Sequence, residues 1–124
     1  MIRLGVSLAI LAALPAQAQP SFAFHDRHLE QLPSGDTALV LRFLNPDLSA
    51  LSYADVAPGL DQLCETEGRV QWAELQPTPD ELVLVVMDRP IPRGTADPEA
   101  TQYISAYRID AQEGCIWQLS LIHI

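Results

Sequence analysis

The chain has 124 residues, of which 7 are Lys or Arg and 16 are Asp or Glu, so its formal net charge is −9. This acidic balance argues against binding to nucleic acid, whose phosphates need a basic surface, and against docking on anionic lipid headgroups. The length suits a single domain with a modest core.

The first eighteen residues have the three parts of a secretory signal peptide. Arg3 gives a positive start, an apolar run follows from Leu4 to Leu14, and Ala16-Gln17-Ala18 forms a small-residue cleavage site. The apolar run is shorter than the roughly 20 residues that a membrane-spanning helix needs, and a buried N-terminal helix is the alternative. We therefore expect cleavage after Ala18, export to the periplasm or the medium, and a mature acidic domain of residues 19–124.

Two strands are expected near the start of the mature domain. The stretch SFAFHDRHLE, 21–30, has mixed polarity and suits a short edge strand. The stretch LPSGD, 32–36, is a turn by its Pro, Gly and Asp. The stretch TALVLRFLN, 37–45, is apolar and partly β-branched, which predicts a strand whose successive side chains face opposite sides of a sheet.

The hydrophobic period changes in the next segment. Apolar residues between Val56 and Cys64 recur three and four apart, which predicts a helix that ends near Gly68. Either Ser52 or Asp55 could cap the start of this helix. Pro58 favours Asp55 as the cap, because proline is tolerated in the first turn of a helix and not in its interior.

Three further strands complete the expected fold. The stretch VQWAEL, 70–75, fits either more helix or a strand, and ELVLVVMD, 81–88, suits a strand buried on both faces. The stretches TQYISAYRID, 101–110, and CIWQLSLI, 115–122, alternate in polarity across a turn and predict an antiparallel hairpin, with a short helix over 98–108 as the alternative. The sum is an α+β domain with one helix packed on a mostly antiparallel sheet of about five strands. We expect a binding surface on the sheet face opposite the helix.

The two cysteines, Cys64 and Cys115, both lie in the mature domain. An oxidising compartment favours a disulfide between them, and the C-x-x-C spacing of a redox motif is absent. The bridge would close a loop of 52 residues and join the helix to the last strand. The chain-entropy model gives such a bridge about 4 kcal/mol of stabilisation.

Three stretches resemble a small family of exported bacterial proteins of unknown function: LCE at 63–65, DRPIPRGTADPEATQYISAYRI at 88–109, and CIW at 115–117. The resemblance covers most of the mature domain and implies its fold and export. Some members carry the label acetolactate synthase, but this chain is far too short for that thiamine-dependent enzyme and lacks its cofactor motif. Pro58-Gly59 departs from the plain helix formers that the resemblance implies at this position.

The stretch DRPIPRGTADPEATQY, 88–103, concentrates polar and turn-forming residues between two apolar runs. One interpretation is a site in which two arginines bind an anion and neighbouring carboxylates act as acid and base. The other is an ordered connector, in which Gly94 takes a positive φ and the arginines pair with nearby acids. No nucleophile–base pair stands in the stretch, which favours the connector. The candidate binding residues are Asp88, Arg89, Arg93, Asp97 and Glu99.

The histidines His25 and His28, with Asp26 between them, could offer two metal ligands. Strand geometry would place the two imidazoles on opposite faces, and a zinc site needs three or four ligands. We therefore expect neither a metal site nor a cofactor.

Two classes of function fit these observations. The first is a non-enzymatic exported binding module, with a protein partner or small anionic ligand against the 88–99 loop or the second sheet face. The second is a small enzyme or small-anion binder that uses the Arg, Asp and Glu residues of that loop. The lack of a recognisable catalytic constellation favours the first class.

Overall fold

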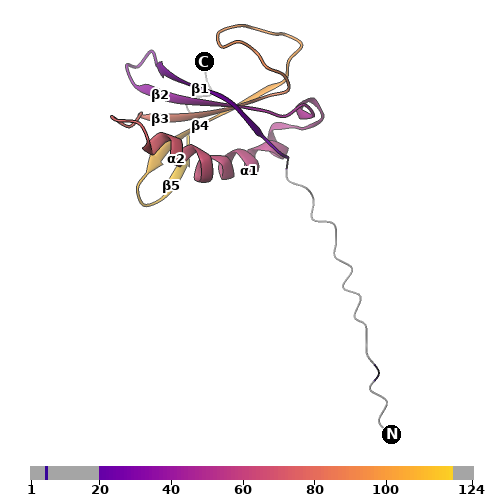
Figure 1. The fold of residues 1–124 in the computed structure, drawn as a ribbon, viewed down its shortest axis with the longest axis horizontal. Helices are drawn as coiled ribbons and strands as arrows, with labels where there is room; N and C mark the ends of the chain where they lie inside the picture. Colours follow the sequence, from indigo (N-terminus) through magenta and orange to yellow (C-terminus); the bar gives the residue numbers. More distant parts are fainter. Residues whose placement is uncertain (1–4, 6–19, 119–124) are drawn as a thin grey trace.

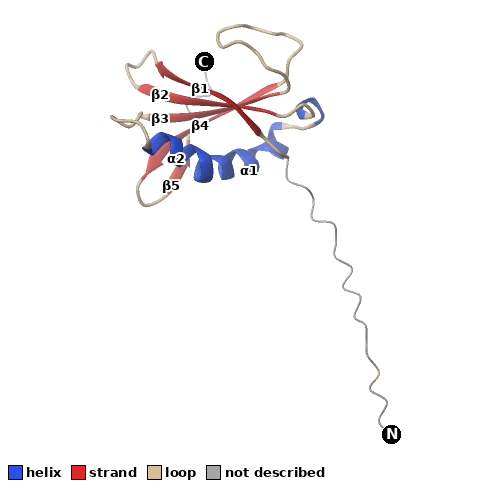
Figure 2. Ribbon diagram, in the orientation of Figure 1, coloured by secondary structure: helices blue, strands red, loops and turns tan. Residues whose placement is uncertain are grey.

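The computed structural model of the chain describes residue 5 and residues 20–118. The expected cleavage site and the last six residues lie outside the described part. In that part, a helical segment packs across one face of a five-stranded sheet, and the opposite face carries the long loop between the third and fourth strands (Figure 1 and Figure 2). The expected α+β domain is confirmed.

The sheet has the strand order β1-β2-β3-β4-β5, so β1 and β5 are its edges. The pair β2–β3 is parallel, whereas β1–β2, β3–β4 and β4–β5 are antiparallel, which makes the sheet mostly antiparallel as expected. The helical segment forms the crossover that a parallel pair requires. The strands are β1 Ala23–Gln31, β2 Thr37–Leu44, β3 Glu81–Met87, β4 Gln102–Asp110 and β5 Gly114–Trp117.

The core lies between the sheet and the helical segment. The parallel register places Leu39 beside Leu82 and Leu41 beside Leu84, and all four side chains are buried. Burying one leucine contributes about 1.5–3 kcal/mol relative to leaving it exposed. Tyr107 of β4 closes this layer, and its hydroxyl donates a hydrogen bond to the Asp61 carboxylate (2.6 Å).

The helix α1, Tyr53–Leu63, starts at a capping box. The Ser52 hydroxyl accepts from the Asp55 N–H (3.2 Å), and the Asp55 carboxylate accepts from the Ser52 N–H (2.8 Å). The preference for Asp55 as the cap is therefore wrong, and Pro58 lies inside the helix. Pro58 leaves the Ala54 carbonyl without a helical donor. Both residues are exposed, so water can take that hydrogen bond.

The prediction that the helix ends near Gly68 is wrong, because the helical segment continues to Ala73. A π-helical turn, Cys64–Gly68, follows α1 and runs directly into α2, Arg69–Ala73. Gly68 keeps a helical φ of −61°. A Cβ atom at this position would lie 2.5 Å from a methyl group of Leu82, so glycine serves the close approach of helix and sheet. The stretch VQWAEL thus begins as helix.

A disulfide joins Cys64 to Cys115, with 6.2 Å between the two Cα atoms, and confirms the expected pairing. The Glu65 carboxylate accepts the Cys115 N–H (2.7 Å) and also an Arg69 N–H (2.9 Å). These contacts and the disulfide fasten the π-helical turn to β5.

The sheet face opposite the helix, where we expected a binding surface, is buried at its centre. Val40, Val85 and Ala106 are all less than 5% exposed. Ile91, from the loop between β3 and β4, is also buried, and its carbonyl accepts a hydrogen bond from Arg42 on this face. The centre of the second face is therefore not an open surface.

The predicted hairpin is confirmed for its described part. The strands β4 and β5 pair from Tyr107–Trp117 to Asp110–Gly114, and Gly114 takes a positive φ of 79° in the connection. The alternative helix over 98–108 is wrong, because β4 begins at Gln102 and its side chains alternate across the sheet. The predicted continuation of the last strand beyond residue 118 lies outside the described residues.

Candidate functional site

The loop between β3 and β4 crosses to the edge of the sheet, and Arg93 holds it there. The Arg93 guanidinium forms a bidentate ion pair with the Glu30 carboxylate of β1, with N–O distances of 2.5 and 2.7 Å. The hydrogen bonds from Arg93 lower the pKa of Glu30, and the same bonds raise the pKa of Arg93. This arginine acts as a clamp between the loop and β1.

The remaining candidate residues of the loop make contacts within the loop itself. Arg89 donates two hydrogen bonds to the adjacent Asp88 carboxylate (3.2 Å each), and this pairing lowers the pKa of Asp88. Asp97 accepts the Glu99 N–H (3.0 Å), which closes a turn. Gly94 takes the positive φ expected of it, 85°. Four of the candidates, Asp88, Arg89, Asp97 and Glu99, thus make their contacts within the loop, whereas Arg93 contacts Glu30 of β1. Both arginines already have carboxylate partners.

A partly buried ion pair that the sequence analysis did not identify lies next to this clamp. Arg42 of β2 is only 4% exposed, and its guanidinium forms a bidentate pair with Asp26 of β1 at 2.7 and 2.5 Å. The hydrogen bonds from Arg42 lower the pKa of Asp26 from 3.8 to about 2. The signal in the sequence was a single arginine within the apolar run 37–45.

Both histidines of β1 reach the same carboxylate. The Nε2 atoms of His28 and His25 lie 3.2 and 3.8 Å from Oδ2 of Asp26. The prediction that they lie on opposite faces is wrong, because a bulge between Phe24 and Asp26 adds one residue to the strand. In residues 20–118, no group of three or more His, Cys, Asp or Glu side chains is placed to hold a metal ion.

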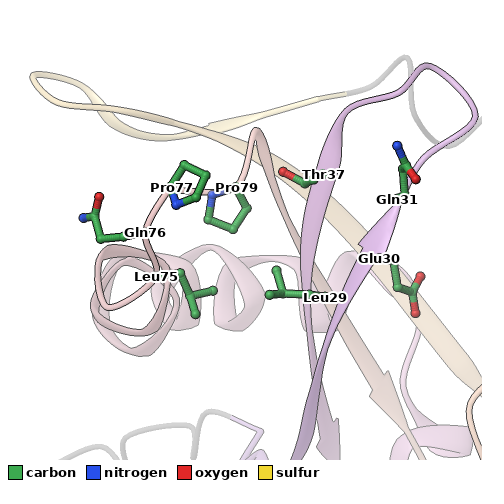
Figure 3. Close-up of a pocket in the computed structure, with 8 residues that line it drawn as sticks. All are labelled: Leu29, Glu30, Gln31, Thr37, Leu75, Gln76, Pro77 and Pro79. Carbon is green, nitrogen blue, oxygen red and sulfur yellow. The ribbon is translucent and has the colours of Figure 1, made fainter.

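An apolar cavity of about 430 Å³ opens beside the edge strand β1, and we call it the β1 groove. In Figure 3, Leu29 of β1 and Leu75 from the end of the helical segment face one another across it. Leu29 is 62% exposed, the largest fraction among the exposed large apolar residues of the described chain. The groove is lined by Leu29, Glu30, Gln31, Thr37, Leu75, Gln76, Pro77 and Pro79.

Hydrogen bonds fix the wall of the β1 groove that faces Leu29. The Trp72 indole N–H donates to the Pro79 carbonyl (2.7 Å), and the Thr37 N–H donates to the Asp80 carboxylate (2.8 Å). These contacts tie the segment after α2 to both the helix and β2. The groove is therefore a preformed feature of the fold, made by two segments, 29–37 and 75–79, that are far apart in the chain.

Two other cavities lie on the helical side of the molecule. One, also about 430 Å³, is bordered by Val70 of α2 and Ile109 of β4, and Val70 is 60% exposed. The other is smaller, about 220 Å³, and lies between Phe22 and Gly59. None of these three cavities is lined by the five candidate residues of the 88–99 loop.

Comparisons with known proteins place the chain in a family. Residues 7–119 match the model of DUF6497, a family of unknown function. The chain belongs to this family. The family assignment confirms the resemblance drawn from the three sequence stretches, and it adds no activity because the DUF6497 family itself has none assigned. No curated protein and no solved structure matches the chain. No described helix is long and apolar enough to cross a membrane.

Proposed function

We propose that this member of the DUF6497 family is an exported, non-enzymatic binding module whose partner contacts the β1 groove. The observation that carries the proposal is the exposure of Leu29, which is 62% accessible and faces Leu75 across a cavity of about 430 Å³. An exposed apolar side chain beside a preformed cavity marks a candidate binding site, and Leu29 lies on the free edge strand of the sheet.

The export part of the proposal is supported by two independent features. The N-terminal sequence has the charged, apolar and small-residue parts of a signal peptide, ending at Ala18. The Cys64–Cys115 disulfide is the kind of bond that forms and persists in the periplasm or outside the cell.

The alternative, a small enzyme or anion binder built on the 88–99 loop, has weaker support. Arg93 already forms a bidentate pair with Glu30, and Arg89 pairs with Asp88. An incoming anion would have to displace one of these carboxylates. The alternative therefore predicts a site that opens only by breaking an existing ion pair.

The proposal is tested by co-purification from the envelope fraction of the native host with matched baits. Leu29→Arg places a charge in the β1 groove, whereas Val70→Arg places the same charge at an equally exposed apolar residue elsewhere. We expect Leu29→Arg to lose, by about tenfold or more, a partner that the wild type and Val70→Arg retain. Thermal unfolding of each bait checks that both variants keep the fold, and the mass of the bait shows whether it begins at Gln19.

Two results would contradict the proposal. A partner that survives Leu29→Arg undiminished does not use the β1 groove. A partner lost only from the variant with Arg89→Ala and Arg93→Ala would move the binding surface to the 88–99 loop.

A further inference from the structure

We infer that the partner of the β1 groove is an extended segment that adds to β1 as a sixth strand, with apolar and basic side chains alternating along it. The inference rests on the proposed function and names the class of partner. It follows from the free edge of β1, from the face on which Leu29 lies, and from the charge of the chain.

The first step is the free edge of the sheet. β1 is the outermost strand, and no other strand of residues 20–118 pairs with its outer side. Such an edge presents unpaired N–H and C=O groups to an added strand. The bulge near His25 distorts the start of β1, but the register with β2 is regular from Asp26 to Gln31. Strand addition therefore fits the second half of β1, residues 27–31.

The second step is the position of the β1 groove relative to that edge. Leu29 pairs with the core residue Leu39, so its side chain lies on the helix-covered face. Neighbouring strands place paired side chains about 5 Å apart on the same face. A side chain of the added strand next to Leu29 therefore enters the space bordered by Leu75 and Pro77. This position selects an apolar residue.

The third step is charge. On the opposite face of β1, the neighbours of an added strand are Asp26, His28 and Glu30. The Asp26 and Glu30 side chains are paired with Arg42 and Arg93 and remain about one-third exposed. Glu74, 58% exposed, contacts Arg27 in the middle of β1. The whole chain carries a net charge of −9. Basic residues on the added strand complement this net negative charge, whereas a second copy of the chain would bring another −9.

A free strand edge next to a side-chain pocket is a known arrangement for peptide recognition. Main-chain hydrogen bonds to a sheet edge supply affinity, and a pocket for alternate side chains supplies specificity. Here the pocket and the regular part of the edge coincide at Leu29. The length available, residues 27–31, predicts recognition of a short extended stretch rather than a large surface.

The test uses three ten-residue peptides and the isotope-labelled protein. The first peptide alternates valine and lysine, the second has the same residues in a non-alternating order, and the third alternates valine and glutamate. We expect the first to bind about tenfold tighter than either control. We also expect it to slow amide hydrogen exchange within residues 27–31, because the added strand protects outward-facing N–H groups. Leu29→Arg abolishes both effects, and Val70→Arg preserves them.

Three outcomes would overturn the inference. Equal binding of the alternating and non-alternating peptides would exclude an extended strand. Protection that appears at β5 or in the 88–99 loop would place the site elsewhere. A dimer of the protein alone, seen by sedimentation and abolished by Leu29→Arg, would make a second copy the occupant.

The inference and the proposed function fail in different ways. If the native partner is lost with Leu29→Arg but no peptide protects residues 27–31, the β1 groove binds without strand addition. If the native partner is retained by Leu29→Arg, the proposed function itself is wrong.

Discussion

The ion pair between Arg42 and Asp26 is the least expected feature at the scale of single residues. A charged side chain is rarely buried unless it is paired, and Arg42 satisfies this condition through Asp26 and the Ile91 carbonyl. The sequence alone showed an arginine in an apolar strand. The sequence analysis did not assign its partner, although the regular register from Gln31–Thr37 to Asp26–Arg42 follows from the turn expected at 32–36.

The lowered pKa of Asp26 makes the free energy of unfolding depend on pH in the acidic range. Because the pKa falls from 3.8 to about 2 on folding, the ion pair stabilises the fold above about pH 4 and is lost as pH falls toward 2. We expect Asp26→Asn to cost about 2 kcal/mol of unfolding free energy at pH 7, since Arg42 loses its partner while the site stays partly solvated. Urea unfolding of the wild type and the variant should converge near pH 2.

The matched control is Glu113→Gln, which removes one negative charge from an exposed turn. It should change the unfolding free energy by less than about 0.5 kcal/mol at either pH. Parallel pH curves for the wild type and Asp26→Asn would contradict the assigned role of the ion pair.

At the scale of elements, sequence patterns identified the strands better than the limits of the helix. The apolar runs of β2 and β3 and the alternation of β4 follow from burial, which is a periodic property. The predicted helix start and end depended on Pro58 and Gly68, which usually lie in the first turn of a helix and just after its end. Neither residue has that position here. Pro58 faces solvent, and Gly68 serves a close contact with Leu82 instead of ending the helix.

The capping box gives the helix start a measurable contribution. Ser52→Ala removes the hydroxyl that accepts the Asp55 N–H, and we expect the unfolding free energy to fall by about 1 kcal/mol. The exposed Ser49, in the short turn before the helix, is the matched control, and its alanine variant should change stability by less than about 0.5 kcal/mol. Equal effects of the two substitutions in chemical denaturation would contradict the assignment of Ser52 as the cap.

At the scale of the whole molecule, the fold class and the disulfide were predictable, and the β1 groove was not. Composition, periodicity and two cysteines suffice for an α+β domain with one bridge. The groove joins Leu29 to the segment 75–79. The segment 75–79 lies beside Leu29 only because the helical segment crosses from β2 to the parallel strand β3. The spacing of residues in the sequence does not predict this arrangement. The 88–99 loop stood out in the sequence because of its composition, and its binding role stays a prediction.

The disulfide should account for a large share of the stability of so small a domain. Replacing both Cys64 and Cys115 with serine removes a bridge across 51 positions of chain, for which the chain-entropy model gives about 4 kcal/mol. We expect a lower urea midpoint for this variant, and no further change when a reductant is added. The wild type should move toward the variant under the same reductant. An unchanged midpoint would show that the fold does not depend on the bridge.

The most direct test of the binding proposal is site-specific photo-crosslinking in intact cells. A photoreactive amino acid is placed at position 29 in one variant and at position 70 in another, both exposed apolar positions of the native chain. If the β1 groove is the binding surface, light produces a defined protein adduct from position 29 and not from position 70. Absence of an adduct at position 29, or the same adduct from both positions, would contradict the account.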